Sequence, residues 1–210
     1  MRVFLGMVLV SVCFAFVSHA EAHPHMFIDT RLDLVLGQGT LEELEITWYF
    51  DPFFTASIAG DYDADGDGEF SSSETEQIRQ NAFSNLENYS YFTFVTTREG
   101  TFTPENIEDF DVFMNGDTLA YRFTSPMNLS LPGGEFSVVI YDETFYCDIL
   151  YHPSDPVTLS GSCADEASCR IVENRDIQIN YGGSISISRE GSSYSGTAFP
   201  QQVVVDLAAN

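Results

Sequence analysis

Residues 26–50, MFIDTRLDLVLGQGTLEELEITWYF, are the stretch that decides the fold class. Apolar and polar side chains alternate from Met26 to Leu36 and again from Leu41 to Phe50, which is the pattern of a half-buried β-strand. Gly37-Gln38-Gly39 lies between the two runs and supplies a short turn. The stretch therefore predicts a β-hairpin.

More strands are expected beyond residue 90. They are Tyr91–Thr97, Asp111–Asn115, Thr118–Thr124, Phe136–Tyr141, Phe145–Tyr151, Val157–Leu159, Ile177–Tyr181 and Phe199–Leu207. The 18 Phe and 10 Tyr also favour strands, because flat rings pack well on a pleated surface. We therefore predict a mainly β protein, an antiparallel β-sandwich formed as a single domain by residues 23–210. Residues 182–197 are rich in Gly and Ser and are expected to be loosely ordered.

A helical insert is expected at about residues 51–90, between the second and third strands. Asp51 is a good N-cap and Pro52 suits the first helical position, so a helix should run to about Tyr62. Ser71-Ser72-Ser73-Glu74 has the form of a capping box that opens a second helix. The acidic segment between these helices makes the insert resemble an EF-hand.

The segment from Asp63 to Glu74 fits the calcium-loop pattern D-x-D-x-D-G-x-x-x-x-x-E at every defined position. Ca²⁺ prefers oxygen ligands, and the pattern assigns one role to each of six residues. The expected ligands are the carboxylates of Asp63, Asp65 and Asp67, the carbonyl of Glu69, a water held by Ser71 and the bidentate carboxylate of Glu74. We expect the ion to act as a structural staple rather than as a switch.

The first 22 residues have the features of an export signal. Arg2 precedes an apolar stretch, Val3 to Val17, that is too short for a stable membrane span. Cleavage after Ala22 fits an A-x-A site, and cleavage after Ala20 is an alternative. A periplasmic location follows, and no later stretch is long and apolar enough to cross a membrane.

Cysteine content and charge bear on the redox state and the partners of the chain, and the acidic surface either solubilises the protein or concentrates cations near a site. Cys147, Cys163 and Cys169 remain after signal removal, and an oxidising compartment favours a disulfide, for which Cys163–Cys169 is the simplest pairing. Connectivity is not fixed by sequence. The chain has 32 acidic and 8 basic residues, all of the latter Arg, so its surface repels nucleic acid and anionic membranes.

His23 and His25 flank Pro24 at the expected mature N-terminus. Neutral imidazoles bind Ni, Co, Zn and Cu, and side chains two apart in an extended segment point to the same side. If cleavage follows Ala22, the α-amine of His23 adds a further ligand, as in a copper histidine brace completed by His25 or His152. The other interpretation is a polar, frayed terminus.

Five segments together resemble a known family. They are His23–Asp29, Thr47–Asp51, Asp63–Gly68, Tyr91–Thr93 and Tyr141–Tyr146. In this order they resemble an uncharacterised periplasmic family of unknown function, described as the periplasmic component of an ABC-type transport system and found beside nickel/cobalt (NicO-type) permeases. The resemblance implies transition-metal handling with His23 and His25 as ligands. Asp142 and Glu143 are further candidate oxygen ligands, or a turn between strands.

Two function classes follow. The first is an exported metal-binding accessory protein of a transition-metal transport system, with an inner-membrane metal permease as its partner and a structural Ca site. The alternative is a calcium-stapled β-sandwich that binds a protein or envelope component without handling transition metal. No nucleophile motif is present, so we expect no enzyme; a copper enzyme built on His23 is a remote third hypothesis.

Overall fold

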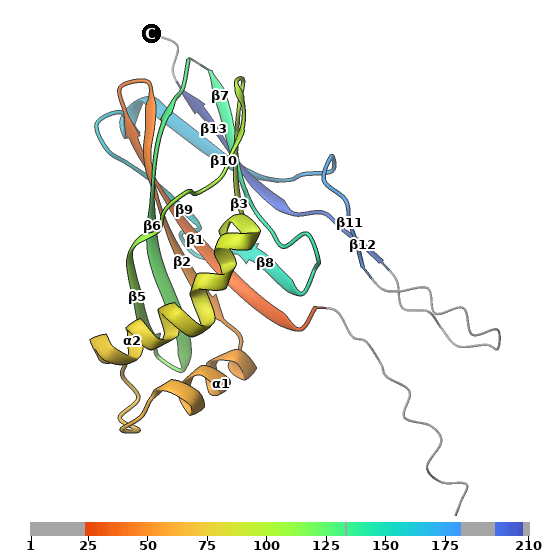
Figure 1. The fold of residues 1–210 in the computed structure, drawn as a ribbon. Helices are drawn as coiled ribbons and strands as arrows, with labels where there is room; N and C mark the ends of the chain where they lie inside the picture. The colour runs from red at the N-terminus through yellow and green to blue at the C-terminus, as the bar shows by residue number, and fades with distance from the viewer. Residues whose placement is uncertain (1–23, 133, 182–195, 208–210) are drawn as a thin grey trace, which may run out of the picture.

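The computed structural model describes residues 24–132, 134–181 and 196–207. The chain folds into two main β-sheets that share one hydrophobic core, with helices gathered at one end of the sandwich (Figure 1). The predicted mainly β fold is confirmed. The predicted signal at residues 1–22, His23 and most of the 182–197 stretch lie outside the described residues.

Sheet A has the strand order β5-β6-β2-β1-β8, and β9 also pairs with β1. Its strands are β1 (Met26–Gly37), β2 (Thr40–Phe50), β5 (Glu108–Asn115), β6 (Thr118–Ser130), β8 (Cys147–Tyr151) and β9 (Val157–Ser160). The predicted hairpin of β1 and β2 is confirmed, with Thr30 opposite Trp48. Burial alternates along β1, and its inward-facing side chains, among them Leu32 and Leu34, lie in the core.

Sheet B has the order β10-β13-β7-β3-β4. Its strands are β3 (Thr93–Thr97), β4 (Gly100–Phe102), β7 (Glu135–Ile140), β10 (Ala167–Glu173) and β13 (Gln201–Leu207). A small two-stranded sheet joins β11 (Ile179–Tyr181) to β12 (Gly196–Ala198). Gly196 and Thr197, at the end of the stretch expected to be loosely ordered, therefore belong to a strand.

The sequence predicted an antiparallel sandwich, and the structure differs from this prediction in two strand pairs. β1 runs parallel to both β8 and β9. The chain passes from β7 in sheet B to β8 in sheet A, so no tight hairpin forces β8 to run against its neighbour. Antiparallel pairing still accounts for all the other strand pairs of the two main sheets in the described part of the chain.

The helical insert, residues 52–92, follows β2. It consists of α1 (Pro52–Tyr62), α2 (Ser72–Ile78), the π-helical segment η1 (Arg79–Phe83) and the 3₁₀ segment η2 (Ser84–Phe92). A third short 3₁₀ turn, η3 (Ala164–Glu166), precedes β10. Among the described residues, no helix combines the length and the apolar character that a membrane span requires.

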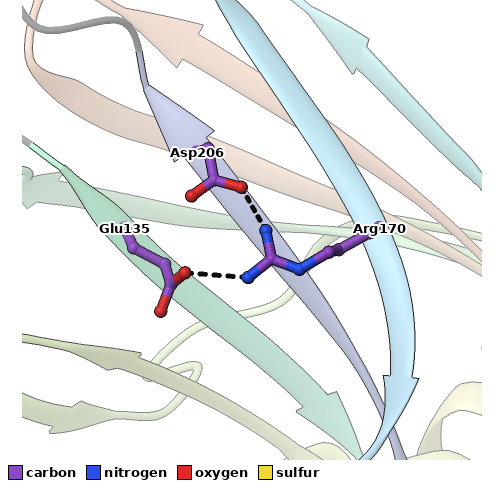
Figure 2. Close-up of polar contacts among 3 residues, drawn as sticks. All are labelled: Glu135, Arg170 and Asp206. Carbon is purple, nitrogen blue, oxygen red and sulfur yellow. Dashed lines mark hydrogen bonds and ion pairs between the residues drawn. The ribbon is translucent and has the colours of Figure 1, made fainter.

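β10 is an edge strand that ion pairs link to β13 and β7. Figure 2 shows Arg170 of β10 between Asp206 of β13 and Glu135 of β7. Its guanidinium pairs with both carboxylates, at 2.9 Å from Glu135, and these hydrogen bonds raise the pKa of Arg170. In so acidic a chain, one arginine thus relieves the repulsion between two carboxylates on nearby strands.

The predicted Cys163–Cys169 disulfide is not formed. Cys147, Cys163 and Cys169 are all free thiols. Cys169 pairs through its backbone with Val205 in sheet B, whereas the N–H of Cys163 donates to Leu36 O in sheet A at 3.1 Å. The two thiols are therefore held by different sheets. Burial, with a smaller contribution from Asp142, raises the pKa of the Cys147 thiol to about 12, so this thiol stays protonated.

Candidate metal centre

The start of α1, the helix that leads into the acidic loop, is fixed by Asp51, as its capping role predicts. Asp51 Oδ1 accepts hydrogen bonds from the N–H groups of Phe53 and Phe54, at 2.8 and 3.0 Å. Its Oδ2 accepts another from Phe27 N–H at 2.9 Å, which sequence reasoning did not foresee. One carboxylate thus starts helix α1 and ties it to β1.

The three aspartates of the loop converge. One carboxylate oxygen each from Asp63, Asp65 and Asp67 lies within 4.8 Å of the other two. In the described residues, no other group of three or more His, Cys, Asp or Glu side chains converges in this way. Gly66 and Gly68 have φ angles of 71° and 78°, a left-handed conformation that glycine adopts without steric cost.

Backbone N–H groups hold these carboxylates in place. Asp63 accepts from Gly66 N–H at 2.8 Å and from Gly68 N–H at 3.0 Å. Asp67 accepts from Glu69 N–H at 2.8 Å. The loop therefore folds around its own acidic side chains, with Glu69 exposed.

The exit from the loop is closed by Ser71 and Glu74, which form the predicted capping box. Glu74 is only 6% exposed. Its Oε2 accepts from Ser71 N–H at 2.8 Å and from Ser71 Oγ at 2.7 Å, and its Oε1 accepts from Ala64 N–H at 2.8 Å. The hydrogen bond from the Ser71 hydroxyl, followed by those from Ala64 and Ser71 N–H, lowers the pKa of Glu74, so an ionised carboxylate joins the start of the loop to its end.

The donor set of this loop fits a hard cation. Asp63, Asp65 and Asp67 offer only oxygen, and Ca²⁺ takes six to eight oxygen ligands in a flexible arrangement. Of the predicted ligands, these three carboxylates lie close together. Glu74 is not part of this group, because its carboxylate instead accepts hydrogen bonds from Ser71 and Ala64. Phe70, at the eighth position, packs against the hydrophobic core, so this loop rests on the β-sandwich. The identity of the cation stays a prediction.

His25 lies at the start of β1 and is exposed. Its N–H donates to Tyr146 O at 2.9 Å, and its ring lies 5.0 Å from the Tyr146 ring. His152 N–H donates to Thr30 O at 2.8 Å, five residues further along β1, which separates the two histidines by about 15 Å or more at 3.3 Å per residue. This spacing is too long for one metal ion to bridge His25 and His152, and the proposed brace on His23 lies outside the described residues.

Asp142 and Glu143 lie in the turn between β7 and β8. Asp142 is 4% exposed, and its carboxylate accepts hydrogen bonds from Thr144 N–H at 2.8 Å, from Thr144 Oγ1 at 2.7 Å and from Cys147 N–H at 3.0 Å. This carboxylate organises the turn. The structure thus favours the turn interpretation over a role as metal ligand for Asp142.

Fold and site together define a mainly β protein with an acidic helix–loop–helix inserted after its second strand. The chain belongs to the family described as "Protein of unknown function (DUF1007)", whose model matches residues 8–206.

Two relatives are described as uncharacterised. The "Uncharacterized 15.5 kDa protein in trpE 3'region" of Spirochaeta aurantia is 29% identical over 100 residues, which cover 47% of this chain and 71% of that protein. An uncharacterised protein of Haemophilus influenzae is 22% identical over 191 residues, 88% of this chain and 90% of that protein. No solved structure matches the chain.

Proposed function

We propose that this chain is an exported, periplasmic protein whose loop from Asp63 to Glu74 binds one Ca²⁺, and that it serves as a metal-binding accessory to a transition-metal transport system. The observation that carries the calcium proposal is the convergence of three aspartate carboxylates between two capped helices. Like charges held this close repel one another, and a dication removes that repulsion.

The calcium ion has a structural role in this proposal. Its loop connects two helices that pack against the β-sandwich. Thr55 Oγ1 accepts from Leu119 N–H at 3.2 Å, Asp51 accepts from Phe27 N–H, and Phe70 packs on the core. Joining Asp63 at the end of α1 to Glu74 in α2 through one ion would hold the helical insert in a single arrangement.

Titration of the purified protein with Ca²⁺ tests this proposal. We expect one Ca²⁺ per chain by calorimetry, with a Kd of about 10⁻⁴–10⁻³ M or tighter, and a rise in melting temperature. Asp65→Asn should weaken binding at least about tenfold, because affinity follows ligand charge. Asp61→Asn is the matched control: it removes the same charge from the exposed end of α1, outside the converging group. Equal effects of the two variants would contradict the loop as the site.

Transition-metal handling is the second part of the proposal. Its support is the resemblance described above, together with the exposed position of His25 at the start of β1, directly after His23 and Pro24. The proposed cargo is Ni, Co, Zn or Cu, and the proposed partner is an inner-membrane metal permease. In this role the protein binds and passes on metal, and no catalytic residue is assigned.

Removal of both terminal imidazoles separates the two function classes. His23→Ala with His25→Ala should abolish stoichiometric binding of Ni²⁺, Zn²⁺ or Cu²⁺ and leave Ca²⁺ binding intact, as measured by native mass spectrometry. His152→Ala is the control, because His152 lies far from His25 and contacts Arg31 and Ser154. If the wild-type protein takes up Ca²⁺ alone, the calcium-stapled sandwich that binds a protein or envelope component becomes the better function.

A further inference from the structure

A hollow of about 350 Å³ lies on the outer face of sheet A, distinct from both the acidic loop and the mainly apolar pocket between sheet A and the helical insert. Phe27 and Asp29 of β1 and Tyr49 of β2 line this outer hollow, together with His152 and the turn between β5 and β6. Its volume is within the range of small-molecule sites, which is about 300–1,000 Å³. Aromatic and polar residues both contribute to its walls, so its chemistry suits a ligand with apolar and polar parts.

Strand register places two aromatic residues beside Asp29. Burial alternates along β1 and β2, with Ile28 and Trp48 buried, so Phe27, Asp29 and Tyr49 all leave the sheet on its outer face. Tyr49 lies directly opposite Asp29 on the neighbouring strand, with Cβ atoms about 5 Å apart. Phe27 lies two residues before Asp29 on the same face of β1 and is 54% exposed, so an aromatic ring is open to the solvent here.

Asp29 is the carboxylate of the outer hollow that is available to a ligand. It is exposed, and its side chain makes no hydrogen bond or ion pair with any residue that the structure describes. Asp51, the other carboxylate in the wall, differs, because both of its oxygens already accept hydrogen bonds from the N–H groups at the start of α1 and from Phe27. A positively charged ligand would therefore pair with Asp29.

The charge around the outer hollow favours a cation. Asp29 and Asp51 are both acidic, and the whole chain has a net charge of −24. One basic side chain, Arg31, lies beside the hollow: its Nη2 is 3.3 Å from His152 Nδ1, and its guanidinium carbon is 5.4 Å from the centre of the Tyr49 ring. Arg31 is thus engaged with His152 and Tyr49 and forms no ion pair with Asp29. An acidic surface of this kind attracts cations and repels anions.

An organic cation suits the outer hollow better than a metal ion does. Within the described residues, a group of three or more converging His, Cys, Asp or Glu side chains exists in the acidic loop and not here. A metal ion also gains nothing from the exposed ring of Phe27. An alkylated ammonium ion, in contrast, is attracted to the faces of aromatic rings and buries its methyl groups against them.

We propose that the outer hollow binds a small alkylated ammonium ion, whose charge pairs with the Asp29 carboxylate and whose methyl groups pack against Phe27 and Tyr49. One carboxylate beside two aromatic rings supplies both the charge and the apolar contact that such a ligand requires. This activity does not rest on the metal-binding proposal, and it uses neither the loop carboxylates nor the terminal histidines.

A matched pair of probes tests the outer hollow. The probes are choline and its uncharged analogue dimethylbutanol, in which a tert-butyl group replaces the trimethylammonium group, so the two differ in charge but hardly in shape. Each is titrated into the ¹⁵N-labelled protein at saturating Ca²⁺, and the backbone amide signals of Phe27, Asp29 and Tyr49 report binding. We expect saturable shifts with choline and an affinity about tenfold higher than that of dimethylbutanol, from one exposed charge pair and the cation–π contacts together.

Asp29→Asn separates charge from shape. It should lower the affinity for choline about three- to fivefold and leave that for dimethylbutanol unchanged, because the uncharged probe makes no ion pair. Asp33→Asn is the matched control: Asp33 lies on the same face of β1 but outside the hollow, and asparagine keeps the oxygen that accepts a hydrogen bond from Ser160 Oγ at 2.8 Å. Tyr49→Leu should also reduce the preference for choline, since it removes a ring but keeps an apolar side chain.

Three results would overturn the proposal. The first is the absence of any saturable shift of these amide signals with choline. The second is equal affinity for choline and dimethylbutanol, because the charge would then play no part in recognition. The third is a saturable response of the same signals to Zn²⁺ but not to choline, which would make the hollow a metal site. Ca²⁺ binding is measured separately by calorimetry, so its outcome is independent of all three.

Discussion

Phe123→Ala is expected to lower the free energy of unfolding by about 3–5 kcal/mol, the usual cost of deleting a buried phenylalanine ring. Phe123 is 0% exposed on β6. Its ring lies 4.9 Å from that of Trp48 in an edge-on contact and 5.0 Å from that of Phe83. The substitution therefore leaves a cavity where the sheet meets the helical insert, and a domain of about 5–15 kcal/mol total stability loses a large fraction of it.

Urea unfolding monitored by circular dichroism measures this loss. Phe53→Ala is the matched control, because the Phe53 side chain is 89% exposed at the start of α1 and its replacement should change stability by less than about 0.5 kcal/mol. If both variants unfolded at the same urea concentration, the aromatic cluster around Phe123 would not be the centre of the core.

Local chemistry made the hairpin and the helix ends predictable. The alternation in residues 26–50 fixes which side chains face inward, and the structure buries Leu32, Leu44 and Ile46 accordingly. The caps at Asp51 and Ser71 depend on hydrogen bonds from N–H groups two or three residues ahead, so they can be recognised from a few consecutive residues. The predicted ends of α1 agree with the structure for this reason.

Long-range pairing was not predictable in the same way. Strand β10 is a mostly exposed edge strand without clear alternation, and its position depends on β13, far along the chain. Strand β6 was expected to end at Thr124 but continues to Ser130, past Pro126. The proline is tolerated because it lies beside a register shift between Leu41 and Glu43 of β2, where the pairing is already irregular.

The acidic loop and the apolar pocket between sheet A and the helical insert differ in the same respect. All six predicted calcium ligands lie within one short segment, so their spacing was informative. The apolar pocket joins Trp48, Tyr121 and the turn at Asp142, which the fold alone brings together. Nothing in the sequence indicates that Trp48 and Tyr121 become cross-strand neighbours, because strand register is a property of the assembled sheet.

Glu74→Gln is expected to weaken Ca²⁺ binding roughly 100-fold, because in the proposed site glutamine would replace a charged bidentate ligand by a neutral amide with one oxygen. The start of α2 should survive, since glutamine also serves at the N3 position of a capping box. The variant thus separates the loss of a metal ligand from the loss of a helix cap. Calorimetry measures the affinity, and circular dichroism without Ca²⁺ checks that the helix content is unchanged.

Glu76→Gln is the matched control for this substitution. Glu76 lies on the same helix, two residues away, and its exposed carboxylate accepts a hydrogen bond from Gln80 Nε2 at 2.7 Å and pairs with Arg79 at 3.9 Å. Its loss removes one negative charge near the loop but no candidate ligand, so the Ca²⁺ affinity should change by no more than about twofold at physiological ionic strength. A Glu74→Gln protein that binds Ca²⁺ as tightly as the Glu76→Gln protein would show that Glu74 is a helix cap alone, and the ion would then be held by Asp63, Asp65 and Asp67 at the open side of the loop.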